Sequence, residues 1–264
     1  MVEVSTLERW FEQCPGALIA FSGGVDSSLV AYLAKHFLGA DRAVAVISAS
    51  PSLKLSDLDA GKQFARSIGL QLKVIATREI ENPDYYNNPS NRCYFCKHTL
   101  YDALKDLAND YPGWWILNGT NADDAGDYRP GLKAAQEFQV RAPLVDCAVD
   151  KVGVRRLAEH FNLVCWDKPA SPCLSSRVPY GEQITVEKLR QIEAAEAILS
   201  AAGFLINRVR HYGNTARIEV PAEARSRIQA DWPSLHSQIL ALGFEQVDLD
   251  AEGFVSGKLN RALP

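Results

Sequence analysis

Short apolar runs alternate with amphipathic segments along the first 76 residues of the chain. The runs at 17–21 and 43–48 are short enough for buried strands, and 71–76 is a third predicted strand. Between them, apolar residues recur every three or four positions, as on one face of a helix. This alternation favours a parallel sheet with helices on both faces. We therefore predict an α/β fold with a doubly wound parallel sheet.

Further apolar segments extend this pattern. The additional predicted strands cover 114–117 and 163–166. The predicted helices cover 1–14, a segment from an N-cap at Ser56 to Ile68, 93–108, and a segment from an N-cap at Asp150 to Phe161. Ligands of such sheets bind at the carboxyl ends of the strands.

The pattern changes near residue 180, where Pro179 and Gly181 interrupt it. Beyond this point we predict a helix ending at Gly203, strands at 204–212 and 215–220, a helix at 222–242 and a strand at 244–249. This order indicates a small α+β domain. We expect a nucleotide-binding domain at 1–180 and a domain for substrate binding or oligomerisation at 181–264.

Composition narrows the class of protein. Of the 264 residues, 47% are hydrophobic, and no apolar run is as long as a membrane span. The net charge of -4 gives no general attraction to nucleic acid. Six cysteines in a chain of this length are not typical of a disulfide framework. We expect a cytoplasmic homo-oligomer with reduced thiols and with neither a membrane nor a nucleic-acid partner.

The stretch SGGVDSS joins the first predicted strand to a helix. Glycines let the backbone approach a ligand closely, and the N–H groups at a helix start favour an anion. The candidate anion-binding residues are Ser22, Gly23, Gly24, Asp26, Ser27 and Ser28. We interpret Asp26 as a magnesium ligand or as a residue that orients the turn. A plain glycine turn is the alternative, and no Gly-Lys-Ser/Thr follows, which excludes a Walker A loop.

Polar residues also follow the fourth predicted strand, at 119–124. Thr120 and Asp124 are candidate contacts for a nucleotide or its magnesium. Alternatively, the segment is a helix start with acidic residues in its first turn. The neighbouring stretch 127–131 has the composition of a turn.

Three cysteines form a second set of candidates. Cys93 and Cys96 make a CxxC at the start of a predicted helix, which is typical of a zinc half-site, a redox pair or an iron–sulfur half-site, or arises by chance. Cys173 lies in a later loop, flanked by Lys168 and Arg177, whose charges suit phosphates. Three thiolates suit a [4Fe–4S] cluster with one open iron. The remaining cysteines, interpreted as buried thiols, are Cys14, Cys147 and Cys165.

Two arginines mark the predicted C-terminal domain. Arg208 and Arg210 alternate on a predicted strand, so they point to one face. Glu219 lies on the next strand. Paired guanidinium groups suit the carboxylates or phosphates of a substrate. A solvent-facing edge strand is the alternative.

SGGVDSS resembles the pyrophosphate loop of the ATP-pyrophosphatases, whose signature is SGGxDS. Together with NRCYFCK, GTNADDAGDYRPG, KPASPCLSSR and RVRHYG, it makes the chain similar to the LarE family over nearly its whole length. The resemblance implies that ATP and magnesium activate a carboxylate of pyridinium-3,5-biscarboxylic acid mononucleotide, after which sulfur displaces AMP. The positions that match the family's substrate-facing residues are Arg208, Arg210, Ser176, Arg177 and Glu219.

The resemblance also bears on the sulfur source. The best-known LarE members use one cysteine, matching Cys173, as a sacrificial donor that becomes dehydroalanine. The presence of Cys93 and Cys96 resembles the three-cysteine branch, which implies a [4Fe–4S] cluster supplied by sulfide or another sulfur donor. The rival interpretations are a tRNA thiolase, which the acidic charge disfavours, an amide ligase such as NAD synthetase, and a nucleotide sensor without activity.

Overall fold

The computed structural model describes residues 2–126, 130–169, 171–255, 258 and 261. The chain divides into two compact units, one of Met1–Glu79 with Cys93–Ser171 and the other of Ile80–Arg92 with Pro172–Pro264. Residues 172–180, expected in the nucleotide-binding domain, therefore lie in the second unit. The side-chain amide of Asn88 holds them there by donating to the carbonyls of Val178 (3.3 Å) and Pro179 (2.6 Å).

The first unit contains a four-stranded sheet of order β3-β2-β1-β4, in which every pair is parallel. Its strands are β1 (Ala17–Ala20), β2 (Ala43–Ser48), β3 (Gln71–Ile75) and β4 (Trp115–Leu117). Its helices are α1 (Val2–Glu12), α2 (Val25–Leu38), α3 (Leu55–Ser67), α5 (Arg92–Ala108), α6 (Gly131–Glu137), α7 (Pro143–Asp146) and α8 (Lys151–His160). The strand order reverses at β1, whose carboxyl end is thus the place where an open α/β sheet binds ligands.

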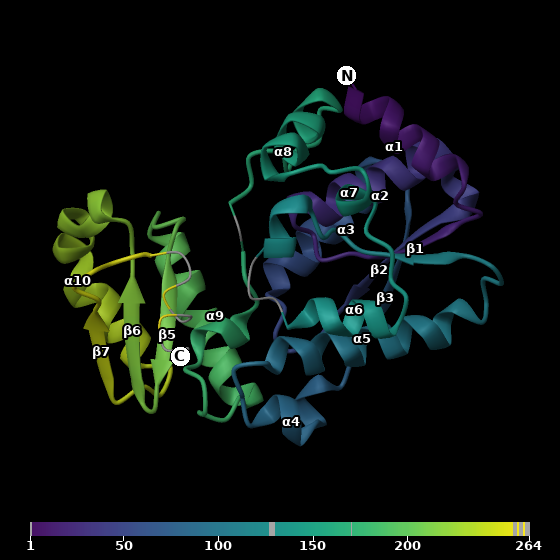
Figure 1. Ribbon diagram of the computed structural model, residues 1–264. Helices are drawn as coiled ribbons and strands as arrows, with labels where there is room; N and C mark the ends of the chain where they lie inside the picture. The colour runs from purple at the N-terminus through teal and green to yellow at the C-terminus, as the bar shows by residue number, and fades with distance from the viewer. Residues whose placement is uncertain (1, 127–129, 170, 256–257, 259–260, 262–264) are drawn as a thin grey trace. The chain divides into compact units, whose positions relative to one another are not determined.

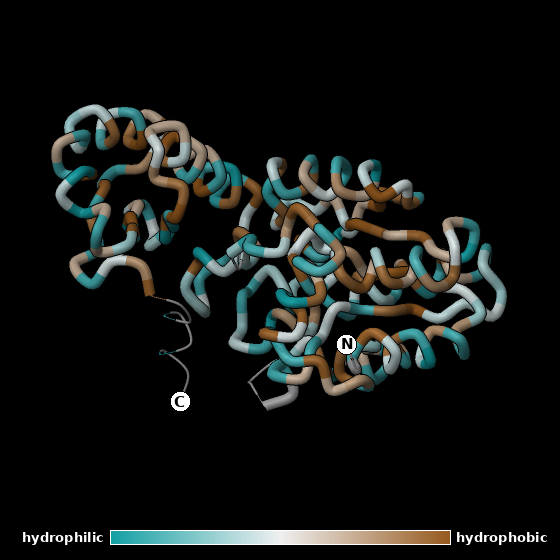
Figure 2. The backbone as a smooth tube through the Cα atoms, turned by 90° about the horizontal axis from the view of Figure 1, so that it is seen from above, coloured by the Kyte–Doolittle hydropathy of each residue, from teal (hydrophilic) through white to brown (hydrophobic). Residues whose placement is uncertain are grey.

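Both faces of this sheet are covered, which confirms the doubly wound prediction. Figure 1 shows α5 and α6 on one side, and α1, α2 and α8 on the other. Alternate residues of β1 face the two sides: Ala17 and Ile19 join the α2 core, whereas Leu18 and Ala20 join the α5 core. The hydropathy colouring in Figure 2 follows this arrangement, with hydrophobic segments gathered inside and hydrophilic helix turns outside.

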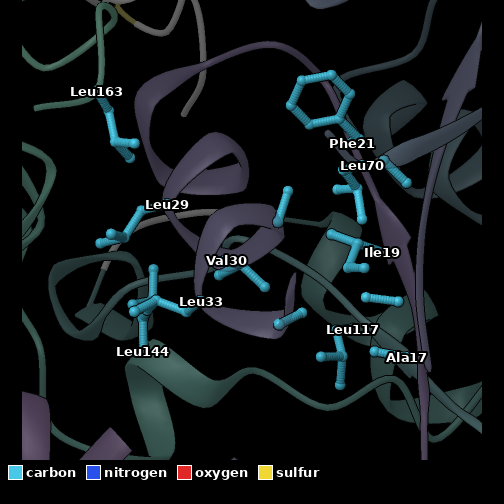
Figure 3. Packing of buried hydrophobic residues seen from close by; sticks show 14 of the residues in the cluster. Ala17, Ile19, Phe21, Leu29, Val30, Leu33, Leu70, Leu117, Leu144 and Leu163 are labelled. Carbon is cyan, nitrogen blue, oxygen red and sulfur yellow. The ribbon is translucent and has the colours of Figure 1, made fainter. Parts of the chain in front are cut away.

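The helix that begins at the SGGVDSS turn is anchored by its apolar residues. Figure 3 shows Leu29, Val30 and Leu33 of α2 packed among the side chains of β1 and Leu144. All four are fully buried. Burial of a leucine contributes on the order of 2 kcal/mol, so this packing fixes where the first turn of α2 lies.

Two local predictions are wrong. The segment 163–166 is a series of turns instead of a strand, and Val164 is 81% exposed. Its carbonyls bind within the loop instead of joining the sheet: that of Leu163 accepts from the N–H of Trp166, that of Cys165 accepts from the N–H of Lys168, and that of Trp166 accepts from the Arg155 guanidinium at 2.7 Å. Helix α3 begins at Leu55 after Lys54, so Ser56 is not its N-cap. By contrast, Asp150 caps α8 as predicted, accepting from the N–H of Gly153 at 2.7 Å.

The second unit is the predicted small α+β fold. Its elements are α4 (Pro83–Tyr86), α9 (Val186–Ala201), β5 (Arg208–Tyr212), β6 (Thr215–Glu219), α10 (Arg225–Leu240) and β7 (Gln246–Leu249). The sheet has the order β5-β6-β7, with β5 antiparallel to β6 and β7 parallel to it. Side chains of α9 and α10 pack on the face that carries Val209 and Ile218. The other face carries the arginines of β5. No helix in the described part of the chain is long and apolar enough to cross a membrane.

Candidate functional site

The SGGVDSS turn is held by its own hydroxyl groups. The hydroxyl of Ser27 accepts from the backbone N–H of Ser22 (3.1 Å) and donates to the carbonyl of Gly24 (3.1 Å). Gly23 has a φ of 73°, a conformation that favours glycine. Gly24 precedes α2 and provides no side-chain cap, so the first N–H groups of the helix are left for a ligand. Ser28 is 1% exposed, so its side chain faces the interior.

Asp26 is engaged on both carboxylate oxygens. Its Oδ2 lies 2.5 Å from Nζ of Lys151, at the first position of α8, and its Oδ1 accepts from the side-chain amide of Asn121 at 3.0 Å. The two charged side chains are 24% and 37% exposed, so solvent and ions reach the pair. In this arrangement Asp26 orients the turn, and a magnesium ion would have to replace Lys151 at its carboxylate.

The segment 119–124 lies directly against the turn. A Cβ atom on Gly119 would stand 2.6 Å from the backbone nitrogen of Ser27, so only glycine fits there. Asp124 is 8% exposed and accepts from the N–H of Asn121 at 3.1 Å, whereas Thr120 is partly exposed. Asp124 therefore stabilises the segment 119–124 from within. Thr120 is the more accessible of the two candidate nucleotide contacts. Of the predicted turn at 127–131, residues 127–129 lie outside the described residues.

A second lysine lies at the other end of the turn. Nζ of Lys168 is 3.3 Å from the carbonyl of Gly23 and 3.0 Å from the Asp57 carboxylate, which also accepts from the hydroxyl of Ser171. Lys151 and Lys168 thus place two positive charges beside one loop of backbone N–H groups. Such a loop attracts phosphates.

In the second unit, two buried ion pairs support the loop that contains Cys173. Arg177 pairs with Glu196 (2.8 Å) and donates to the carbonyls of Pro172 and Cys173. Arg210 pairs with Glu219 through two bonds of 3.0 and 3.1 Å and donates to the carbonyl of Ser176 at 2.7 Å. These arginines are not solvent-facing, so the edge-strand alternative does not apply to them.

Arg208 lies beside these pairs without a carboxylate partner among the described residues. It is 7% exposed, and its guanidinium stacks on the ring of Phe254 at 4.4 Å. Burial lowers the pKa of Arg208, and the nearby charges of Arg177 and Arg210 lower it further. Arg177 and Arg210 each have a glutamate partner and Arg208 has none among the described residues, so its charge remains for an anionic ligand.

The candidate cysteines lie close to the points where the chain passes between the two units. Cys93 directly follows Arg92, and Cys173 follows Pro172. Cys93 and Cys173 are exposed, and Cys96 is partly exposed. Within the described ranges, no group of three or more His, Cys, Asp or Glu side chains is arranged to hold a metal ion. As ligand types, however, three accessible cysteine sulfur atoms fit an iron–sulfur cluster.

Contacts inside the second unit hold the segments next to these cysteines. The guanidinium of Arg92 donates to the side chain of Asn88 at 2.6 Å and lies over the ring of Tyr180. The hydroxyl of Tyr85 is 2.5 Å from that of Ser175, two residues after Cys173. The chain before Cys93 and the chain after Cys173 thus belong to one packed assembly.

The remaining cysteines are of another kind. Burial raises the pKa of Cys14 and Cys165, and burial raises that of Cys147 to about 11. A thiol with a raised pKa is a poor nucleophile and a poor metal ligand near neutral pH. The prediction of buried thiols is confirmed for Cys14 and Cys165, whereas Cys147 is only partly buried.

Comparison with known proteins now decides the family. The chain is 35% identical to the pyridinium-3,5-bisthiocarboxylic acid mononucleotide synthase of Lactiplantibacillus plantarum, over 98% of this chain and 94% of that protein. It belongs to the family of that synthase. It is also 45% identical to an uncharacterised protein of Synechocystis sp., over 99% of this chain and 98% of that one. A third relative, uncharacterised, from Methanocaldococcus jannaschii, is 29% identical over 89% of each chain.

A family model described as NAD synthase also matches, over residues 9–88. This match covers β1 to β3 and the SGGVDSS turn. Membership of the synthase family confirms the LarE resemblance drawn from the sequence, because that relative spans both units. The sequence patterns did not single out Asn121 and Lys151, which bind the Asp26 carboxylate, or Glu196, which pairs with Arg177. Lys151 could have been suspected from the sequence, because it directly follows the predicted helix N-cap Asp150.

Proposed function

We propose that the protein is an ATP-dependent sulfurtransferase that converts pyridinium-3,5-biscarboxylic acid mononucleotide into the bisthiocarboxylic acid. The observation that carries this proposal is the 35% identity to the synthase of Lactiplantibacillus plantarum over 94% of its length. The charged SGGVDSS turn supports the ATP-dependent half of the reaction. The buried arginine cluster of the second unit supports an anionic substrate.

ATP activates the substrate in the first step. A carboxylate oxygen attacks the α-phosphorus, the bond to the β-phosphate oxygen breaks, and pyrophosphate leaves with magnesium. The backbone of Gly23 and Gly24, with the hydroxyls of Ser22 and Ser27, binds the phosphates, and Thr120 and Asp124 border them. Lys151 and Lys168, which flank the turn, neutralise the departing pyrophosphate. Asp26 would hold the magnesium ion if Lys151 moved from its carboxylate to the phosphates.

The arginine cluster receives the substrate in this proposal. Arg208, whose charge has no carboxylate partner among the described residues, binds the phosphate or a carboxylate of the nucleotide. Arg210 and Arg177 contribute charge while their pairs with Glu219 and Glu196 fix their positions. The second unit thus serves the substrate, and the first unit serves ATP. The homo-oligomeric state stays a prediction.

The sulfur atom comes from outside the protein chain in this proposal. Cys93, Cys96 and Cys173 would hold a [4Fe–4S] cluster, which would supply sulfide for transfer at its open iron. The acyl group loses AMP as the C–S bond forms, and the second carboxylate reacts in a second round. The alternative donor is the sulfur of Cys173 itself, whose loss would leave dehydroalanine. All three side chains are exposed to solvent to some degree, which a cluster bound by them requires.

Substrate-dependent release of pyrophosphate tests the proposed function. We expect pyrophosphate only when the biscarboxylate nucleotide is added with MgATP. Release with transfer RNA would instead indicate a thiolase, and release with a carboxylic acid and ammonia would indicate an amide ligase. Absence of release with all three would leave only the sensor interpretation.

A further inference from the structure

A short part of the chain between β3 and α5 leaves the first unit and belongs to the second. It runs from Ile80 to Arg92, and the first unit resumes at Cys93. We call this part the excursion, and residues 172–181, which contain Cys173, the Cys173 loop. Both lie in the second unit. The excursion therefore ends directly before one candidate cysteine and shares a packed unit with the loop that contains another.

Asn88 is the centre of the contacts between the excursion and the Cys173 loop. It is 0% exposed, and its backbone has a φ of 54°. Its side-chain amide donates to the carbonyls of Val178 (3.3 Å) and Pro179 (2.6 Å), and its own backbone carbonyl accepts from the N–H of Gly181 at 2.9 Å. Asparagine is one of the few residues that adopt this left-handed conformation readily. One buried residue thus binds the loop through both its side chain and its backbone.

The side-chain oxygen of Asn88 extends this connection to the end of the excursion. It accepts from the guanidinium of Arg92 at 2.6 Å, and Arg92, which is 3% exposed, directly precedes Cys93. At the other end of the Cys173 loop, the guanidinium of Arg177 donates to the carbonyl of Cys173 at 3.2 Å. Hydrogen bonds within the second unit therefore hold the residue before Cys93 and the backbone of Cys173.

Ordering of the Cys173 loop matters for a ligand that needs all three thiols. Cys93 and Cys96 belong to one helix, whereas Cys173 lies much further along the chain in a loop. A loop that has to be ordered when its ligand binds loses conformational entropy, which weakens binding, and a loop ordered beforehand avoids most of this loss. The third thiol is therefore the one whose contribution depends most on the contacts around it.

We propose that Asn88 is a positioning residue for the three-cysteine iron–sulfur site, because its side chain holds the Cys173 loop on the excursion before iron binds. This inference rests on the proposed function, since it takes the cluster as the ligand. Asn88 provides no ligand to iron in this account. It acts through the backbone carbonyls of the loop and through Arg92.

Replacement of Asn88 by glycine tests this role in the full-length protein. Asn88→Gly removes the side-chain amide, while glycine tolerates the left-handed backbone. Native and variant protein are reconstituted without oxygen from ferrous iron and sulfide, and the release of iron to a chelator is followed by visible absorption, well below the thermal midpoint. We expect the native protein to take up about four irons per chain. The variant should release them about 10- to 100-fold faster, as for the loss of one or two hydrogen bonds.

Two further measurements separate positioning from a general loss of stability. Pyrophosphate binding, a property of the turn in the first unit, should be the same in Asn88→Gly and in the native protein. Asn162→Gly is the matched control, because Asn162 also has a φ of 54° but lies in the first unit, after α8. This control should release iron at the native rate.

A second variant covers the case in which Asn88→Gly does not fold. The hydroxyls of Tyr85, in the excursion, and Ser175, in the Cys173 loop, are 2.5 Å apart. Tyr85→Phe/Ser175→Ala removes both partners of this bond, so neither hydroxyl is left buried and unpaired. The double variant loosens the same two segments and should also release iron faster than the native protein.

The results separate this inference from the proposed function. Native rates of iron release in Asn88→Gly, or in Tyr85→Phe/Ser175→Ala if the glycine variant does not fold, would overturn the positioning role alone. Equal acceleration in Asn162→Gly and Asn88→Gly would overturn it as well. A native protein that takes up no iron would overturn the proposed cluster and this inference together.

Discussion

The ammonium group of Lys151 lies 2.5 Å from the carboxylate of Asp26, although 125 residues separate them in the chain. The pair joins the first turn of α8 to the SGGVDSS turn. Lys151 thus neutralises the negative charge of Asp26 before a ligand binds. Magnesium and phosphate together provide a better partner for each side chain, so we infer that the pair opens when MgATP binds.

The variant Lys151→Met tests this exchange. Loss of one charge-assisted contact to the pyrophosphate should lower the rate of pyrophosphate release about 10- to 100-fold. The thermal midpoint should change little, because the pair is partly exposed. Lys62→Met is the matched control, since Lys62 forms a surface pair with Asp59 at 3.1 Å. Equal rates in the two variants would remove Lys151 from the phosphate site.

Gly24 offers a cleaner test of the turn than a bulky replacement does. Its φ of -79° is open to any residue, and an added Cβ would meet only the hydroxyl of Ser22, at 3.5 Å. Gly24→Ala should therefore fold with an unchanged thermal midpoint. Pyrophosphate binding, followed by calorimetry, should nevertheless weaken markedly, because the methyl group stands where a phosphate approaches the backbone. A variant that binds pyrophosphate normally would show that the phosphates lie elsewhere.

The two arginines of β5 should behave differently when replaced. Arg210→Met leaves Glu219, which is 1% exposed, without its bidentate partner, so we expect a loss of about 3 kcal/mol in the free energy of unfolding. Arg208→Met removes a buried charge that lies beside two others, so stability should hold or rise. Binding of the substrate nucleotide should weaken in Arg208→Met. Denaturant unfolding and nucleotide titration measure the two effects, and a destabilised Arg208→Met protein would contradict the assigned charge surplus.

The lowered pKa of His211 leads us to expect that the stability of the protein depends on pH. Burial lowers its pKa from 6.5 to about 4, assisted by the charge of Lys188. The unfolded chain binds a proton near pH 6.5 and the folded chain does not, so stability falls as the pH drops from 6.5 towards 4. The full effect is about 3 kcal/mol. In urea titrations, His211→Asn should lose this part of the slope, and parallel pH profiles for the two proteins would contradict it.

Strands β1 and β2 could be predicted because their apolar runs match their burial, whereas β3, which has no buried residue, was found from its apolar run alone. The segment 163–166 is also apolar but forms turns, because composition does not reveal that its carbonyls accept from Arg155 and from backbone N–H groups three residues further on. The turn residues at 22–28 could be found from their local pattern. Lys151 could not be paired with Asp26, because that contact depends on the packing of α8 against α2.

The measurement that tests the account most directly counts the sulfur atoms transferred by each chain. Protein prepared without oxygen, with about four irons per chain, is incubated with the biscarboxylate nucleotide, MgATP and sulfide, and both product and intact protein are analysed by mass spectrometry. We predict repeated thiocarboxylate formation with an unchanged protein mass, lost when Cys93, Cys96 or Cys173 is replaced by Ser but kept when Cys14 is replaced. No more than one sulfur per chain, with dehydroalanine at position 173 and full activity in a Cys93→Ser/Cys96→Ser protein, would contradict the account.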